Sequence, residues 1–400
     1  MTNTLEPVMS RLASRQGAMV ETLASWVAIP TGRNHTPGLD RFRGEITGRL
    51  EALGATTSLV AGDPKEAWLG DTKDATIPPT AVCDRLVDGA VRTFIAGHLD
   101  TVFPPDSPFD SLTVSPDGAT ATGPGVVDMK GGLLIAVEAL EALHAEGIET
   151  GWTFLLNSDE ETGSYHSHRA LRETAGRHDV GLALEPALPG GGLAVRRKGS
   201  GQFYIEAHGR SAHAGREFEK GVSAVYALAR AITEIETLSD VKRGLTVNIG
   251  PVEGGVATNI VPPLARAWGN VRFPEEALAE AFGARLSALN TAGDAMPRIV
   301  TKHNFSRPAK PLTPGTERLA SVVKSCAESL GQTMDLVSTG GVCDGNIMQA
   351  AGLPTIDTLG VRGGGLHTTD EWIELPSLSE RAQLFASLLV ALDQNWNTPT

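Results

Sequence analysis

Three short apolar segments in the first half of the chain lead directly into residues with metal-binding side chains. They are 91–96, followed by His98 and Asp100; 152–157, followed by the acidic run 159–161; and 180–184, followed by Glu185. Their β-branched and aromatic content predicts buried strands. Packing alone does not favour carboxylates at the ends of buried strands. These strand ends constrain the fold strongly, because clustered carboxylates repel one another. They must therefore be exposed to solvent or be neutralised by a cation.

Helix-like segments alternate with these strands, which favours an α/β fold with a mostly parallel sheet. Amphipathic patterns predict helices over 5–28 and 42–53, and an apolar face predicts another that begins near residue 133. Asp128 lies just before that helix, in a glycine-flanked turn. In parallel sheets the functional site lies at the carboxyl ends of the strands. We therefore expect Asp128 to lie beside the polar strand ends.

The pattern changes in the middle of the chain. Predicted elements follow the order βαββαβ over 196–306, which is typical of a ferredoxin-like α+β domain. Pro308, Pro311 and Pro314 then mark the return to the first domain. A chain of 400 residues is too long for one compact core. We therefore predict one domain formed by 1–195 plus 307–400, with 196–306 inserted into it.

Composition narrows the classes of partner. A formal net charge of -13 argues against nucleic acid and against anionic membrane as partners. The three cysteines, Cys83, Cys326 and Cys343, lie far apart, which argues against a disulfide framework or a cysteine zinc site. Residues 1–19 lack the apolar core of a secretory signal, and no apolar run is long enough to span a bilayer. The default expectation is a cytoplasmic protein.

The candidate ligands are histidines and carboxylates, without a ligand cysteine. Such ligands suit zinc and also cobalt or manganese. Two imidazoles and several carboxylates could hold two ions roughly 3.5–4 Å apart. Each piece also has a plainer interpretation: His98 with Asp100 resembles a hydrogen-bonded core histidine, and an aspartate before a helix usually caps it.

Several motifs occur together in one order along nearly the whole chain. They are Gly97-His98-Leu99-Asp100-Thr101, the turn 123–132, Asp159-Glu160-Glu161-Thr162-Gly163-Ser164, Glu185-Pro186, Gly209-Arg210-Ser211-Ala212-His213-Ala214-Gly215 and a late His367. In this order they resemble the zinc-dependent aminoacylase/carboxypeptidase family of metallopeptidases. That family includes glutamate carboxypeptidase, acetylornithine deacetylase and succinyl-diaminopimelate desuccinylase. The likeness is greatest to folate-cleaving glutamate carboxypeptidase.

The resemblance implies a di-zinc catalytic domain with two zinc ions per subunit. Asp128 would bridge the two ions, and the peptide bond between Asp128 and Met129 would be cis. His98 and Glu185 would complete the ligand set of one ion, and Glu161 and His367 would complete that of the other.

The resemblance also assigns the remaining catalytic roles. Asp100 would orient His98. Glu160 would be the general base that takes a proton from the metal-bridging water and passes it to the leaving amine.

The resemblance further implies that the inserted domain is a lid and a dimerisation domain. His213 would reach the site from the partner subunit of a homodimer and stabilise the oxyanion. Arg272 and Asn259 would hold the free carboxylate of the substrate. Gly364, in the glycine run 363–365, would supply backbone donors near His367.

The expected function is hydrolysis of the amide bond of an N-acyl or N-aminoacyl amino acid that keeps a free carboxylate. A glutamate-like C-terminal residue is the first expectation. One alternative is a deacylase of a small N-acetyl or N-succinyl amine. Another is a catalytically silent, metal-holding dimer that serves as a binding protein, although an intact Glu160 speaks against it.

Overall fold

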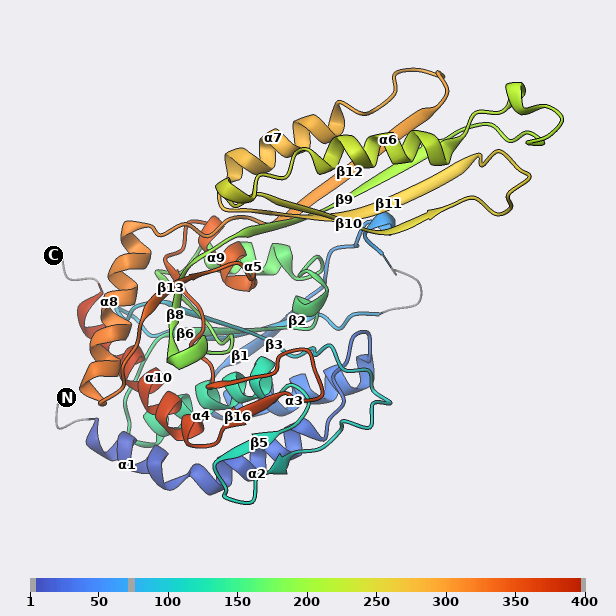
Figure 1. The fold of residues 1–400 in the computed structure, drawn as a ribbon. Helices are drawn as coiled ribbons and strands as arrows, with labels where there is room; N and C mark the ends of the chain where they lie inside the picture. The colour runs from blue at the N-terminus through green and yellow to red at the C-terminus, as the bar shows by residue number, and fades with distance from the viewer. Residues whose placement is uncertain (1–4, 71–75, 397–400) are drawn as a thin grey trace.

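A six-stranded sheet lies at the centre of the larger part of the molecule (Figure 1). The computed structural model describes residues 5–70 and 76–396. The strands are β1 (Thr56–Val60), β2 (Thr80–Arg85), β3 (Thr93–His98), β6 (Trp152–Asn157), β7 (Val180–Ala183) and β14 (Thr355–Ile356). Across the sheet they run in the order β1-β2-β6-β3-β7-β14.

This sheet is mixed. β3 pairs in parallel with β6 and β7, and β7 with β14, whereas β1 and β2 join through antiparallel pairings. In the parallel half His98 lies opposite Asn157, and Ala96 lies opposite Ala183. The three strands that lead into the acidic and histidine residues therefore end at one edge of the sheet.

Helices cover both faces of the sheet. One hydrophobic core includes residues of α1 (Glu6–Ser14), α2 (Gln16–Val27), α3 (Thr36–Ala52), α4 (Gly131–Ala145), α8 (Pro314–Ser329) and α10 (Pro376–Asn395). Another includes α5 (His168–Ala175) and α9 (Asp344–Ala350). Adjacent residues of β3 belong to different cores, Ile95 to the first and Phe94 to the second, as strand alternation requires. Among the described residues, no helix combines the length and the apolar character that crossing a bilayer demands.

Two smaller sheets flank this body. β8 (Leu193–Arg197) pairs in parallel with β13 (Leu336–Thr339). The other sheet runs in the order β15 (Gly363–Gly364), β16 (Trp372–Glu374), β5 (Thr120–Thr122) and β4 (Thr113–Val114). The first of these sheets leads into the middle segment of the chain, and the second supports the loop that carries His367.

Residues 199–307, called the β9–β12 unit from here on, form a separate four-stranded sheet with two helices. Its elements are β9 (Gly199–His208), α6 (Ala224–Glu236), β10 (Thr246–Gly254), β11 (Leu264–Phe273), α7 (Glu276–Ser287) and β12 (Arg298–Arg307). The strand order is β10-β11-β9-β12, with antiparallel pairings throughout. Both helices lie on the face turned away from the six-stranded sheet (Figure 1), over a hydrophobic core of their own. The elements follow the βαββαβ order that the sequence predicts.

The first helical region differs from the single helix expected over 5–28. It is divided at Arg15, which has φ -92° and ψ 2°. At this break the Arg15 guanidinium donates hydrogen bonds to the carboxylate of Glu138 on α4. The side chain of Glu138 is fully buried. Arg49 of α3 donates to the same carboxylate at 2.8 Å. Glu138 thus ties three helical segments together, which a periodicity argument does not reveal.

We expect Glu138→Gln to lower the free energy of unfolding at pH 7 by about 2 kcal/mol, because hydrogen bonds from two guanidinium groups lose their charged acceptor. Burial opposes ionisation, but Arg15 and Arg49 outweigh it and hold the pKa of Glu138 below its usual value. The contribution of Glu138 is therefore full above the pKa of an unfolded glutamate, about 4.3, and is lost progressively as pH falls from there through the lower pKa of the folded state. Urea denaturation at pH 7 and at a series of pH values below this point measures both effects.

The matched control is Glu141→Gln, because Glu141 also pairs with Arg49 but is 31% exposed. We expect this change to cost under about 1 kcal/mol. Equal losses from the two substitutions would contradict the special role of Glu138.

Candidate metal centre and active site

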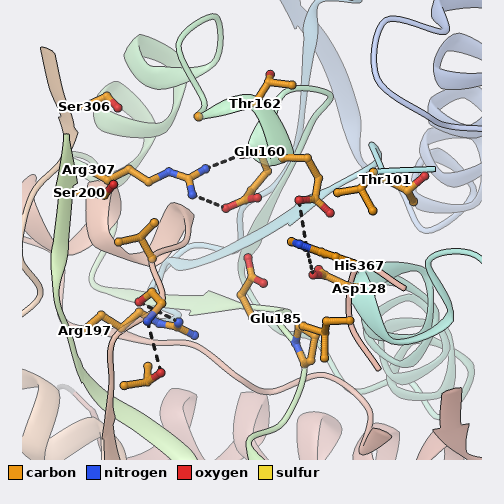
Figure 2. A pocket seen from close by; sticks show the side chains of 18 of the residues that line it. Thr101, Asp128, Glu160, Thr162, Glu185, Arg197, Ser200, Ser306, Arg307 and His367 are labelled. Atoms are coloured by element: carbon orange, nitrogen blue, oxygen red, sulfur yellow. Dashed lines mark hydrogen bonds and ion pairs between the residues drawn. The ribbon is translucent and has the colours of Figure 1, made fainter. Parts of the chain in front are cut away.

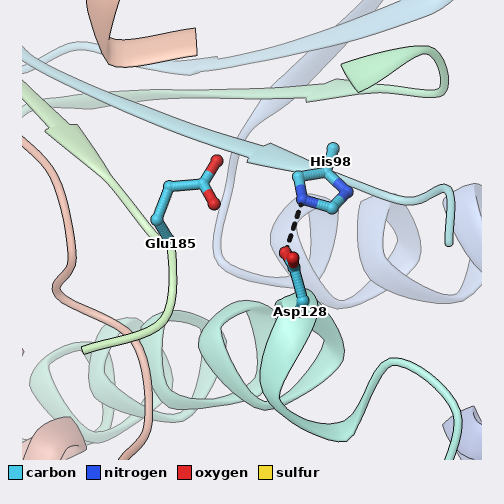
Figure 3. A group of neighbouring side chains, drawn as sticks. All are labelled: His98, Asp128 and Glu185. Carbon is cyan, nitrogen blue, oxygen red and sulfur yellow. Dashed lines mark hydrogen bonds and ion pairs between the residues drawn. The ribbon is translucent and has the colours of Figure 1, made fainter. Parts of the chain in front are cut away.

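Two groups of ligand-type side chains meet at the carboxyl edge of the parallel strands. His98, Asp128 and Glu185 form one group, shown in Figure 3. Asp128, Glu161 and His367 form the other. Within each group the ligand atoms lie within 4.8 Å of one another, and Asp128 belongs to both. The structure therefore brings together all five residues expected to bind metal, in the two sets that the resemblance implies.

The Asp128 carboxylate lies between the two imidazoles. Its Oδ1 is 3.1 Å from Nε2 of His98, and its Oδ2 is 3.5 Å from Nε2 of His367. The same His367 nitrogen is 3.3 Å from Oε2 of Glu161. Burial would raise the pKa of Asp128, but hydrogen bonds from His367 and His98 hold it well below its usual range. Asp128 is thus the ionised centre of the cluster.

Glu185 and Glu161 lie in the opposite electrostatic situation. Burial raises the pKa of Glu185 well above its usual value, and the neighbouring Glu160 and Asp128 raise it further. Burial likewise raises the pKa of Glu161. Among the described residues Oε1 of Glu185 is buried without a hydrogen-bond partner. Buried carboxylates that repel one another, with one oxygen left unpartnered, are the chemical setting that a divalent cation relieves.

Glu371 fixes the turn that presents Asp128. Its carboxylate accepts backbone N–H groups of Gly125, Val127 and Asp128, at 2.9–3.1 Å. The peptide bond between Asp128 and Met129 is cis, as expected. The turn leads into α4 through Gly131, where a Cβ would lie 2.5 Å from a backbone oxygen. A glycine is therefore required where the turn becomes the helix.

The acidic loop after β6 holds Glu160 apart from the metal-ligand groups. The Asp100 carboxylate accepts the backbone N–H of Glu160 at 3.2 Å and of Glu161 at 3.0 Å. The Nδ1 atom of His98 lies 2.9 Å from the backbone oxygen of Asp100 and 3.6 Å from its carboxylate. Asp100 therefore contacts His98 mainly through its carbonyl, while its carboxylate organises the acidic loop.

Glu160 faces an arginine across the site. Its Oε1 lies 2.7 Å from Nη1 of Arg307. Figure 2 marks this ion pair by a dashed line. Burial raises the pKa of Glu160 to about 8, although Arg307 opposes that rise. A buried carboxylate whose pKa lies near neutrality has the proton affinity that general-base catalysis requires.

A pocket of about 880 Å³ lies at this site, and its lining includes Asp128, Glu160, Glu161, Glu185 and His367. Its walls include residues of both the large body and the β9–β12 unit, among them Arg197, Ser200, Arg272, Arg307, Gly363 and Gly364. The predicted substrate-binding residues Arg272 and Gly364 therefore lie at this pocket. Arg272 is half-buried, and its Nε donates to the amide oxygen of Asn270 at 3.0 Å.

Two predicted residues lie elsewhere. His213 and Asn259 are exposed and lie outside the pocket lining. They are neighbours: His213 forms a β-bridge with Ile260, and the N–H of Ala214 donates to the carbonyl of Asn259. The loop that carries His213 projects from the far end of the β9–β12 unit (Figure 1). Within one chain, the structure does not bring these two residues to the metal-ligand groups.

Several charged residues around the site are not predicted from the sequence. Arg307 contacts Glu160, Glu371 holds the Asp128 turn, and Asp357 lies 2.7 Å from Nη2 of Arg197 and 3.1 Å from Nζ of Lys310. A buried polar residue next to a recognised motif is the one available clue, and Glu371 follows the His367 loop closely. Arg307 and Asp357 lie far in sequence from their partners, so no local pattern marks them.

Comparison with known proteins places this geometry in a family. The sequence matches "Peptidase family M20/M25/M40" over residues 94–391. Carboxypeptidase G2 of Pseudomonas sp. (strain RS-16) is 27% identical over 398 residues, which cover 94% of this chain and 90% of that protein. Succinyl-diaminopimelate desuccinylase of Methylorubrum populi is 30% identical over 330 residues, covering 75% and 82%.

A solved structure agrees with these matches. The crystal structure of aminopeptidase PepT from Bacillus cereus has a TM-score of 0.74 and 25% sequence identity to this chain. The match covers 94% of this chain and 98% of that one. The metallopeptidases of this family use divalent metal ions, and the two ligand groups that share Asp128 are a matching cluster. The chain belongs to peptidase family M20/M25/M40 and is a hydrolase.

Proposed function

We propose that the protein is a di-zinc amidohydrolase that cleaves N-acyl or N-aminoacyl amino acids with a free carboxylate. The observation that carries this proposal is the pair of ligand groups joined by Asp128, with the separate carboxylate of Glu160 at the same pocket. In this assignment His98, Asp128 and Glu185 hold one ion, and Asp128, Glu161 and His367 hold the other. Histidine and carboxylate ligands suit zinc, with cobalt or manganese as substitutes.

Two bound cations would polarise the scissile carbonyl and lower the pKa of an attacking water. Glu160 takes the proton from that water and delivers it to the nitrogen of the leaving amine. The Asp100 carboxylate supports this role because it fixes the backbone at Glu160 and Glu161, so that the base and the ligand keep separate directions.

Arg272 is the proposed anchor for the substrate carboxylate, because a guanidinium matches a carboxylate through two parallel hydrogen bonds. Burial and the nearby Arg307 lower the pKa of Arg272, so an anionic substrate group is electrostatically favoured there. The similarity to carboxypeptidase G2 supports a glutamate-like C-terminal residue. The similarity to succinyl-diaminopimelate desuccinylase supports the second candidate, a deacylase of small N-acyl amines.

We further propose that residues 196–306 form an inserted lid and dimerisation domain, with 1–195 plus 307–400 as the catalytic domain. His213 and Asn259 would then act in the site of the partner subunit, since the fold places them away from the pocket of their own chain. Exposed apolar side chains lie on the same projecting loops: Phe218 is 60% exposed and Val256 is 89% exposed. Apolar surface of this kind favours burial in an interface. The cytoplasmic location stays a prediction.

The first test follows hydrolysis of a panel of N-acyl and N-aminoacyl amino acids by free-amine release, with zinc-loaded protein. We expect Glu160→Ala to retain its metal while kcat falls about 10²–10⁴-fold, the range for loss of a general base. The matched control is Glu161→Ala, which should lose metal as well as activity. Metal content is measured by elemental analysis. Turnover that survives the Glu160→Ala substitution would contradict the proposal. Turnover that survives complete removal of the metal by a chelator would contradict it as well.

A second test concerns the turn that presents Asp128. Glu371→Gln replaces one acceptor oxygen by an NH₂ group that cannot accept the backbone N–H groups. We expect zinc affinity to fall about 10–100-fold, as for other residues that orient metal ligands. Competition with a zinc chelator of known affinity measures the change. Glu374→Gln is the control, because Glu374 instead pairs with Arg362; equal losses would contradict the assignment.

A third test asks whether each active site needs two chains. We expect His213→Ala and Glu160→Ala each to be inactive alone, whereas unfolding and refolding them together should restore about one quarter of the parent activity. Half of the random dimers are then mixed, and one of their two sites holds both intact residues. Refolding each variant by itself is the control. An inactive mixture in which mixed dimers are demonstrated would place His213 outside the partner site.

A further inference from the structure

Arg307 is a buried arginine at the proposed active site. The proposed mechanism includes no role for this side chain. Arg307 is the last residue of β12, and its side chain is 7% exposed. Its Nη1 lies 2.7 Å from the Glu160 carboxylate, and its Nη2 donates to the Glu160 carbonyl at 2.7 Å. Two different nitrogens of one guanidinium therefore contact the side chain and the backbone of the same residue.

The same guanidinium also contacts the loop beyond Glu160. Nη2 donates to Oγ of Ser164 at 2.8 Å, and that hydroxyl donates to Oδ1 of Asp344 at 2.6 Å. Asp344 in turn accepts from the amide of Asn157, the last residue of β6. Arg307 is thus connected to both ends of the acidic loop and to the strand that precedes it.

A β-bulge directs Arg307 toward this loop. Asn304 pairs with Gln202, but the next pair is Arg307 with Ser200, so β12 contains one extra residue relative to β9. An extra residue re-aims the side chains that follow it. The bulge is packed in place: Phe305 stacks on His303 with ring centroids 4.8 Å apart, and a Cβ on Gly201 would lie 2.0 Å from the Phe305 ring. The glycine leaves the room that the ring occupies.

We propose that Arg307 is a positioning residue that holds the Glu160 carboxylate in the direction needed to accept a proton from the attacking water. The inference rests on the proposed role of Glu160 as the base. Glu160 lies beside other buried acids, which repel it, and the pocket leaves space into which an unrestrained side chain could turn. A two-nitrogen contact to carboxylate and carbonyl fixes the orientation of Glu160 as well as its charge, which a single ammonium group cannot do.

The test compares Arg307→Ala and Arg307→Lys with the parent protein, all zinc-loaded, in the amine-release assay. We expect Arg307→Ala to lower kcat about 10²-fold, the effect of misplacing a reacting group by about 1 Å. Bound zinc should stay within about twofold because the metal ligands are intact, and any rise in KM should be smaller than the fall in kcat because Arg272 is intact. Arg307→Lys should recover only part of kcat. Adding guanidinium ion to Arg307→Ala at millimolar concentration should raise kcat, whereas urea, which has a similar shape without the charge, should not.

Arg298→Ala is the matched control, because Arg298 is the exposed first residue of the same strand, and it should match the parent. Unchanged kcat in Arg307→Ala, or a rise in KM alone, would overturn the inference. If Arg307→Ala does not fold, Arg307→Lys decides in the same way through its kcat. Glu160→Ala separates the two proposals: its inactivity beside a fully active Arg307→Ala refutes only this inference, whereas an active Glu160→Ala refutes the proposed function.

Discussion

Repulsion among buried carboxylates is the constraint on which the rest of the structure depends. Asp128, Glu160 and Glu185 are all buried at one edge of the central sheet, with Glu161 beside them. Without compensation such a cluster would take up protons or force the edge apart. The two histidines offset part of the charge at Asp128, and Arg307 offsets part at Glu160. Among the described residues Oε1 of Glu185 has no hydrogen-bond partner, so the side chains of the protein compensate this cluster only in part.

The scaffold fixes these groups chiefly through carboxylates that accept backbone N–H groups. Asp100 does so for the acidic loop, and Glu371 does so for the Asp128 turn. Each of these carboxylates fixes the backbone of residues whose side chains line the site. The positions of those side chains therefore depend on the fixed backbone as well as on their rotamers. Burial raises the pKa of Glu371 to about 7, although the backbone N–H groups that it accepts oppose that rise. The acids of the site therefore divide into those in or beside the metal-ligand groups and those whose carboxylates accept backbone N–H groups.

The sequence predicts what is locally encoded. Strands that end in His98 and Glu185 are visible as apolar runs with polar ends, and parallel pairing then brings the ends together. The βαββαβ order of the middle segment follows from the periodicity of each element. The antiparallel β1 and β2 were not predicted, because pairing direction depends on the path of the connections. The division of the first helix at Arg15 is also hidden, because the carboxylate that Arg15 contacts there lies 123 residues away in sequence.

Long-range pairing also explains why the contacts at the junction between the two units are not predicted, although the position of the junction is. The chain crosses between them twice, and the crossings lie side by side through backbone bonds between Arg197 and Lys310. Asp357 binds both of these side chains, and the Asn346 amide donates to a backbone carbonyl in each crossing, at 2.9 and 2.7 Å. Both crossings are thereby fixed to one body.

A rigid unit attached in this way turns most readily about its attachment, and residues beside a pivot move least. Arg307 directly precedes the second crossing, whereas His213 lies on a loop at the opposite end of the unit (Figure 1). Rotation of the β9–β12 unit would therefore displace His213 by a large distance while Arg307 stays close to Glu160. The architecture thus separates two positions: Glu160 is held beside the crossings through Arg307, and His213 lies on a loop far from them.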